Sequence, residues 1–181
     1  MNQPMRKNGY LLLELVLYIG ISVIVLTVFL SFAWGLIQDQ SKQKALTEVI
    51  DGGEFVLSTI SYNAERATTV SNSTVYATHP GTIVLTYPST PNITFDTYQK
   101  NITLNGQEFA IRKLRMTVTG SSSVDLTNDN VSVNNFVLTN LSSGDAKAFS
   151  IQLTLESLNP SLSQAYDAQK SWTTAVTLKI R

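Results

Sequence analysis

The sequence predicts an α+β protein in which one long N-terminal helix packs on a mostly antiparallel β-sheet. Three observations lead to this class. Residues 10–37 are mostly apolar and carry a single charged residue, Glu14. Residues 46–67 carry apolar side chains at the i, i+3, i+4 spacing of an amphipathic helix. After residue 70 apolar and polar residues alternate, which is typical of half-buried strands.

The composition excludes several classes of function. The chain has 181 residues and is formally neutral, with 13 Lys+Arg and 13 Asp+Glu, so we predict no nucleic-acid partner. The absence of Cys excludes disulfides, thiol catalysis and cysteine-ligated metal sites. The single histidine, His79, is expected in a surface turn before Pro80. No nucleophile-elbow, P-loop or zinc motif occurs, so we expect neither enzymatic activity nor a cofactor.

The apolar segment, residues 10–37, is long enough to cross a membrane, because about 20 apolar residues span the bilayer core as a helix. Arg6 and Lys7 before it and Asp39 after it favour a cytoplasmic N-terminus. A cleavable secretory signal is one interpretation, but such signals are shorter and end in small residues. A plain signal anchor leaves Glu14 unexplained. A carboxylate in a spanning helix costs on the order of 2–3 kcal/mol, which indicates a function.

Residues 6–37 resemble the processing signal of the type IV pilins and type II secretion pseudopilins. The signal has a basic leader (here Arg6 and Lys7), a glycine before the cut (Gly9), an apolar or aromatic first mature residue (Tyr10), and a glutamate after three apolar residues (Glu14). Phe or Met is commoner where this chain has Tyr10. A threonine is often found where it has leucine at position 11.

The resemblance implies a role and a set of partners. A prepilin peptidase would cut between Gly9 and Tyr10 and methylate the new amine of Tyr10. Glu14 would act in assembly, pairing with the N-terminal amine inside a filament. The implied partners are this peptidase and methyltransferase, other pilins or pseudopilins, the inner-membrane assembly platform and the lipid bilayer. The chain would cross the inner membrane once, with its N-terminus cytoplasmic and its head outside, before joining a filament.

The resemblance and the periodicity together divide the chain into four segments. Residues 1–9 are the leader, 10–37 the transmembrane and filament-core helix, 38–69 its amphipathic extension and 70–181 the antiparallel β head, the lollipop layout of pilins. Glu65-Arg66-Ala67 near the helix end and a final strand ending at Arg181 resemble minor, J-like pseudopilins. A signal-anchored extracytoplasmic binding or adhesion domain is the alternative function.

Gly52-Gly53 interrupts the apolar stripe of the helical extension. The pair would act as a hinge, allow close packing of the helix on the sheet, or mark a break between two helices. In the head, alternation predicts strands over 83–87, 109–118, 149–156 and 172–181. Asn105-Gly106 predicts a two-residue type I′ hairpin. A loop is expected over 157–171, with a helical turn near 164–170.

Two polar clusters in the head have ordinary structural interpretations. Weak calcium candidates are the oxygen-bearing side chains Asp125, Asn128, Asp129 and Asn130. Their spacing fits no EF-hand and is typical of turns, so no metal is predicted. The basic cluster Arg112, Lys113 and Arg115 is expected to be a solvated face.

Overall fold

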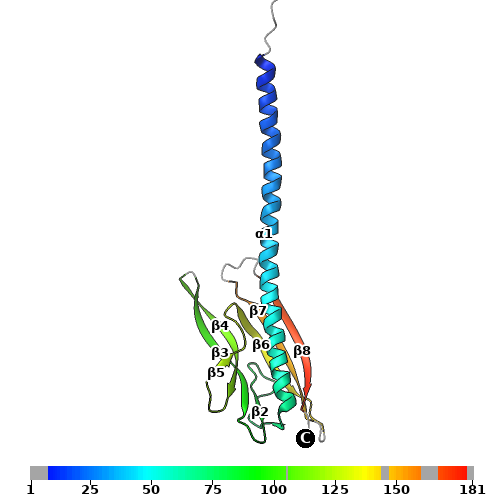
Figure 1. The fold of residues 1–181 in the computed structure, drawn as a ribbon, viewed down its shortest axis with the longest axis vertical. Helices are drawn as coiled ribbons and strands as arrows, with labels where there is room; N and C mark the ends of the chain where they lie inside the picture. The colour runs from blue at the N-terminus through cyan, green and yellow to red at the C-terminus, as the bar shows by residue number, and fades with distance from the viewer. Residues whose placement is uncertain (1–7, 105, 144–146, 160–166, 179–181) are drawn as a thin grey trace, which may run out of the picture. The chain divides into compact units, whose positions relative to one another are not determined.

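A computed structural model describes residues 8–104, 106–143, 147–159 and 167–178 (Figure 1). Within these residues one helix, α1 (Asn8–Arg66), precedes eight strands. The strands are β1 (Thr69–Val70), β2 (Ile83–Thr86), β3 (Ile93–Leu104), β4 (Gln107–Val118), β5 (Ser123–Asp125), β6 (Val131–Asn140), β7 (Ala148–Ser157) and β8 (Gln169–Thr177). They form a five-stranded sheet, β1-β2-β3-β4-β5, and a three-stranded sheet, β6-β7-β8, with every pair antiparallel. The prediction of a long helix followed by antiparallel strands is confirmed, but the strands form two sheets and not the single sheet that was predicted.

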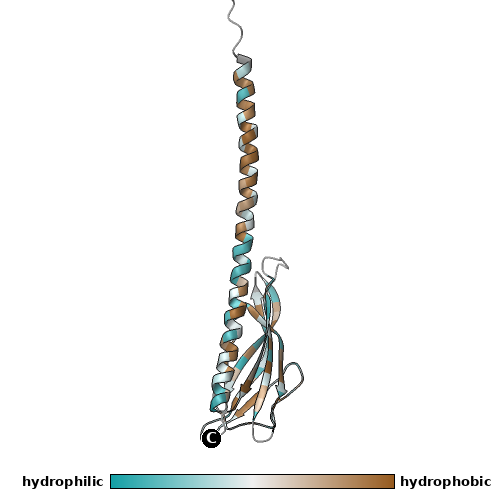
Figure 2. Cartoon of the chain, turned by 90° about the vertical axis from the view of Figure 1, so that its right-hand side faces the viewer, coloured by the Kyte–Doolittle hydropathy of each residue, from teal (hydrophilic) through white to brown (hydrophobic). Residues whose placement is uncertain are grey.

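The chain divides into two units, residues 1–41 and 42–181. The N-terminal unit contains the first part of α1. The large apolar side chains from Tyr10 to Ile37 are all exposed, and Figure 2 shows most of this part of the helix in brown. A regular helix places these side chains around its whole circumference, so no polar face is left for water. By length and composition this helix could cross a membrane.

The part of α1 in the C-terminal unit buries one stripe of small and branched side chains. The buried positions are Ala45, Val49, Gly53, Val56, Ile60 and Ala64. Apart from Gly53, these residues belong to one core together with side chains from both sheets, including Phe95, Phe136 and Phe149. The predicted stripe is confirmed except at Leu46, which is exposed because Ala45 takes the inward position in that turn. The helix ends at Arg66, a cation well placed for the negative end of the helix dipole.

Gly52 and Gly53 lie in uninterrupted helix. A Cβ added at Gly53 would lie 2.3 Å from the Trp172 indole, so this glycine lets the ring of β8 pack directly on the helix backbone. A Cβ at Gly52 would make only an ordinary contact, 3.7 Å from Leu155. Of the three predicted possibilities, the structure supports close packing of helix on sheet.

The longest hairpin joins β3 and β4 in a regular register from Ile93↔Val118 to Leu104↔Gln107. The pairing leaves a two-residue loop, as predicted, and Gly106 has φ +80°. Asn105 lies outside the described residues, so the turn type stays a prediction. The predicted strands over 83–87, 109–118 and 149–156 correspond to β2, β4 and β7.

The bounds of the last strand, β8, differ from those of the predicted strand over 172–181. β8 begins at Gln169, so the predicted helical turn is wrong for residues 169–170. It ends at Thr177, and Arg181 lies outside the described residues. Most of β3 and the whole of β6 were not predicted. In β6 the register shifts between Val133 and Asn135, and such a bulge breaks the alternation by which a strand is recognised.

The outer edge of β6 is covered by the segment between β1 and β2. Ala77 N–H donates to the Leu138 carbonyl, and Gly81 N–H donates to the Phe136 carbonyl, both at 2.8 Å. The Phe136 N–H donates to Nδ1 of His79 at 3.0 Å. The single histidine therefore takes the place of a backbone carbonyl on this edge, in the surface loop where the sequence predicted it.

Candidate functional site

The residues of the predicted processing signal lie at the start of α1. Gly9 and Tyr10 fall in its first turn, and Glu14 follows one turn later. Arg6 and Lys7 lie outside the described residues. The Glu14 side chain is exposed among leucines, isoleucines and valines, and no described residue offers it a hydrogen bond or an ion pair. A helix of this composition requires a partner for that carboxylate wherever water is excluded.

A charged cluster in the C-terminal unit is centred on Lys113 of β4. This side chain is only 2% exposed, and its Nζ donates to Asp129 Oδ1 at 2.7 Å. A second carboxylate oxygen, Asp125 Oδ2, lies 3.7 Å away. Lys100 of β3 reaches the same Asp129 at 2.9 Å. The prediction that this basic cluster faces solvent is wrong for Lys113. At this residue β4 is covered, and the ammonium is buried against Asp125 and Asp129. The sequence alone does not place these acids beside it.

Aromatic and guanidinium groups extend this cluster. The Tyr98 hydroxyl donates to both carboxylate oxygens of Asp125 at 2.9 Å. Arg115 makes a bidentate pair with Asp96 at 2.8 and 2.9 Å, and its guanidinium lies 4.9 Å from the Tyr98 ring centroid. Burial, then the bond to Asp125, raises the pKa of Tyr98. These contacts hold the segment that connects the two sheets, residues 119–130, against the β3–β4 hairpin.

The same geometry bears on the weak calcium candidates. Asp125 and Asp129 are brought together, but the group between them is the Lys113 ammonium, a cation supplied by the chain. Asn128 Oδ1 accepts the N–H of Asn130 at 3.1 Å, the bond of an Asx turn. Among the described residues no group of three acidic or histidine side chains is arranged to hold a metal. The side-chain oxygen atoms of Asp125 and Asp129 form ion pairs, and that of Asn128 forms a turn.

The cluster predicts a pH dependence of stability. Hydrogen bonds from Lys113 and then Lys100 hold the pKa of Asp129 below its ordinary value. A carboxylate with a lowered folded-state pKa stabilises the fold above its unfolded pKa of about 3.9, and this contribution is lost as pH falls through the folded-state pKa. We therefore expect the free energy of unfolding to fall below about pH 4, and Asp129→Asn to flatten that decline.

At neutral pH, Asp129→Asn should cost about 1–2 kcal/mol, because it weakens the pairing of a buried ammonium while Asp125 remains close. Urea titrations from pH 2 to 7 measure both effects. Asp51→Asn, at an exposed helix position, is the matched control and should leave the profile unchanged. A wild-type profile that Asp129→Asn does not alter would contradict the assignment.

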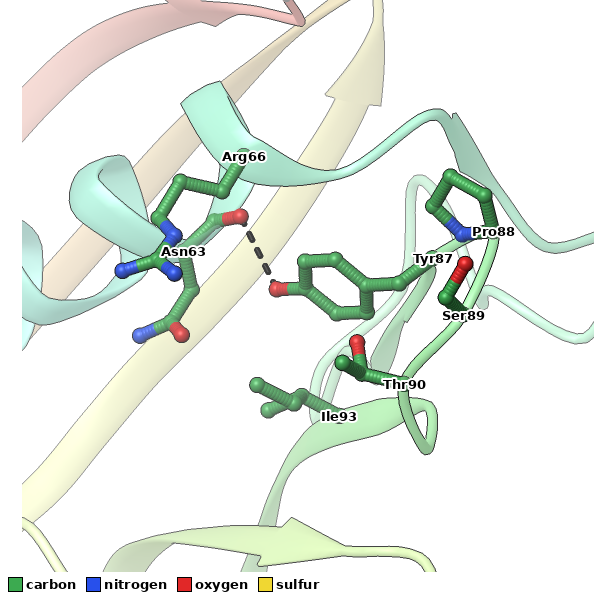
Figure 3. Close-up of a pocket in the computed structure, with 7 residues that line it drawn as sticks. All are labelled: Asn63, Arg66, Tyr87, Pro88, Ser89, Thr90 and Ile93. Atoms are coloured by element: carbon green, nitrogen blue, oxygen red, sulfur yellow. Dashed lines mark hydrogen bonds between the residues drawn. The ribbon is translucent and has the colours of Figure 1, made fainter.

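One cavity of about 560 Å³ lies at the end of α1, beneath the loop from β2 to β3 (Figure 3). Its lining residues are Asn63, Arg66, Tyr87, Pro88, Ser89, Thr90 and Ile93. The Tyr87 hydroxyl donates to the Asn63 carbonyl at 2.9 Å. Arg66 donates to the Tyr62 hydroxyl and lies 5.1 Å from that ring centroid, which holds the guanidinium in place.

The chemistry of this cavity suits a small anion. Arg66 has no ion-pair partner in the described parts of the chain, whereas Lys100, Lys113 and Arg115 are all paired. Burial raises the pKa of Tyr87, and the charge of Arg66 opposes the shift. Arg66 was predicted only as part of a helix-end resemblance. The cavity could not be predicted, because no pattern in the sequence links Arg66 to residues 87–93.

Comparisons with family models, with curated proteins and with solved structures found no match to this chain.

Proposed function

We propose that the chain is a structural subunit, a minor pilin or pseudopilin, of a type IV pilus-like or type II secretion-like filament. The observation that carries the proposal is Glu14, the single carboxylate within residues 10–37 of α1, where the large apolar side chains are all exposed. Its place after Gly9 and Tyr10 is that of the prepilin signal. The apolar surface serves the subunit in the membrane and again in the filament, because lipid and neighbouring helices are both apolar.

The role of Glu14 follows from electrostatics. In a bundle of packed apolar helices an unpaired carboxylate is costly, and so is an unpaired amine. Cleavage after Gly9 creates an amine at Tyr10, close to one turn from Glu14 along the helix. Pairing of this amine with Glu14 of a neighbouring copy satisfies both groups and favours one axial register. The J-like minor subunit remains the narrower form of the proposal.

Processing is tested by intact-mass and N-terminal analysis of the protein purified from membranes of a host that contains its prepilin peptidase. We expect loss of residues 1–9 and a methylated amine on Tyr10. Gly9→Val should accumulate as the full-length precursor, since a bulky residue replaces glycine beside the cut. Leu36→Val, within the apolar segment but far from the cut, is the control and should be processed like the wild type.

The second candidate, a signal-anchored binding domain, is favoured by the cavity beside Arg66, which offers hydroxyl groups and a guanidinium that has no ion-pair partner among the described residues. This candidate predicts an anchor that is retained without processing. An intact N-terminus in the native host would therefore support it and contradict the filament subunit.

A further inference from the structure

In the C-terminal unit, the side of α1 that faces away from the sheets is uncovered. The sheets lie on one side of this part of the helix (Figure 2), and the buried stripe of α1 packs in their core. On the opposite side Lys44, Asp51, Phe55 and Tyr62 are all exposed. Residues four or seven apart point to the same side of a helix, so these four side chains share one face. This surface is named the outer face of α1.

The outer face carries two large aromatic side chains in contact with water. Phe55 is 55% exposed and Tyr62 is 59% exposed. Aromatic residues are enriched at protein contacts, where they supply much of the binding energy. The Arg66 guanidinium lies over one face of the Tyr62 ring, 5.1 Å from its centroid, so the other face is the one that a partner can reach. An exposed aromatic pair, two turns apart on one helix face, indicates a contact surface.

The charges on the outer face are separated along the helix. Lys44 precedes Asp51 by two turns, and neither forms an ion pair with a described residue. A second α1 lying alongside in the same direction, without an axial shift, would oppose lysine to lysine and aspartate to aspartate. A shift of seven residues, about 10.5 Å, instead opposes Lys44 of one copy to Asp51 of the next. The same shift opposes Phe55 to Tyr62, so one displacement matches both pairs.

We propose that the outer face of α1 binds the outer face of a second copy, parallel to the first and displaced by seven residues, with Lys44 against Asp51 and Phe55 against Tyr62. The inference rests on the proposed function, because a membrane or a filament gives every copy the same direction. No like charges meet at this displacement, since the glutamates at positions 48 and 54 come opposite the uncharged residues at 55 and 61. The contact is head-to-tail, so it propagates from copy to copy.

Charge reversal tests the ion pair. Lys44→Asp should reduce the yield of sheared filaments about tenfold, because it opposes two carboxylates at every contact between copies. Asp51→Lys should do the same with two ammonium groups. The double variant Lys44→Asp/Asp51→Lys restores opposite charges and should recover to within about twofold of the wild type. Lys42→Asp is the control and should assemble normally, because a residue two positions away points to the opposite side of the helix.

Cysteine cross-linking tests the displacement, since the chain has no native cysteine. Residues 55 and 62 of one helix are about 10.5 Å apart, too far for a disulfide within the chain. Oxidised filaments of the variant Phe55→Cys/Tyr62→Cys should therefore give a ladder of trimers and longer products. Each single-cysteine variant should stay monomeric, because its copies lie seven residues apart along neighbouring helices. A closed two-fold pair would end the ladder at dimers.

Two results overturn the inference and leave the proposed function in place. One is a set of filaments in which a single-cysteine variant cross-links as fully as the double-cysteine variant, or in which the double variant forms no ladder. The other is a double charge variant that assembles no better than the single ones while the Lys42→Asp control assembles normally. The charge variants decide the question if loss of both rings prevents assembly. Failure of the proposed function is distinct: the wild-type chain then keeps residues 1–9 and forms no filament, and the inference fails with it.

Discussion

Replacing Gly53 by alanine should lower the free energy of unfolding of the C-terminal unit by about 2–3 kcal/mol. The added methyl group would lie 2.3–2.7 Å from three ring atoms of Trp172. Trp172 is held between the helix and Lys170, so the ring cannot move without losing contacts. Overpacking therefore outweighs the gain of roughly 1 kcal/mol that alanine brings to a helix interior.

The neighbouring glycine is the matched control. Gly52→Ala places its methyl group 3.7 Å from Leu155, an ordinary contact, and should stabilise the protein by up to about 1 kcal/mol. Chemical unfolding followed by circular dichroism measures both variants in the same detergent. Equal stability of the two alanine variants would show that Trp172 does not pack on the helix at Gly53.

Replacing Glu14 by alanine should abolish filament formation while leaving cleavage after Gly9 intact. The variant removes the carboxylate that the proposed filament pairs with the Tyr10 amine, so each buried amine is left without a partner, at a cost of about 3–5 kcal/mol for each copy. We expect at least a tenfold loss of sheared filaments, measured by immunoblot against the membrane-bound pool.

Asp39→Ala is the control, because Asp39 lies on the same helix just beyond the apolar segment and is exposed. It should assemble like the wild type. Glu14→Gln removes the charge and keeps the shape of the side chain. It should abolish filament formation as Glu14→Ala does. Normal assembly of a processed Glu14→Ala subunit would remove the pairing role while leaving the processing assignment untouched.

The elements with strong periodicity could be predicted from sequence. The apolar residues of α1 and the alternation in β2, β4 and β7 each extend over enough residues to identify the element. β6 was not predicted because its alternation of apolar residues changes phase at the bulge. The apolar positions are odd-numbered before it, at Val131 and Val133, and even-numbered after it, at Phe136 and Leu138. β3 was not predicted because Phe95 is its one buried residue among residues 93–103, so the strand shows no regular alternation of apolar and polar residues.

The surroundings of Lys113 could not be predicted for a different reason. A basic residue in an alternating strand ordinarily faces water, and the sequence shows no partner nearby. The acids that neutralise it come from the end of β5 and from the loop after it, and their positions depend on how the chain crosses there between the two sheets. The Arg66 cavity likewise depends on bringing residues 63–66 beside the β2–β3 loop, a tertiary contact that local patterns do not encode.

The packing of Trp172 on Gly53 also sets an order of events for a newly made chain. α1 leaves the ribosome first, but the strand that packs on its Gly53 comes last among the described elements. Until β8 arrives, the helix backbone at Gly53 lacks the Trp172 ring, and closing so long a loop is entropically slow. Completion of this contact between the helix and the sheet therefore waits for β8.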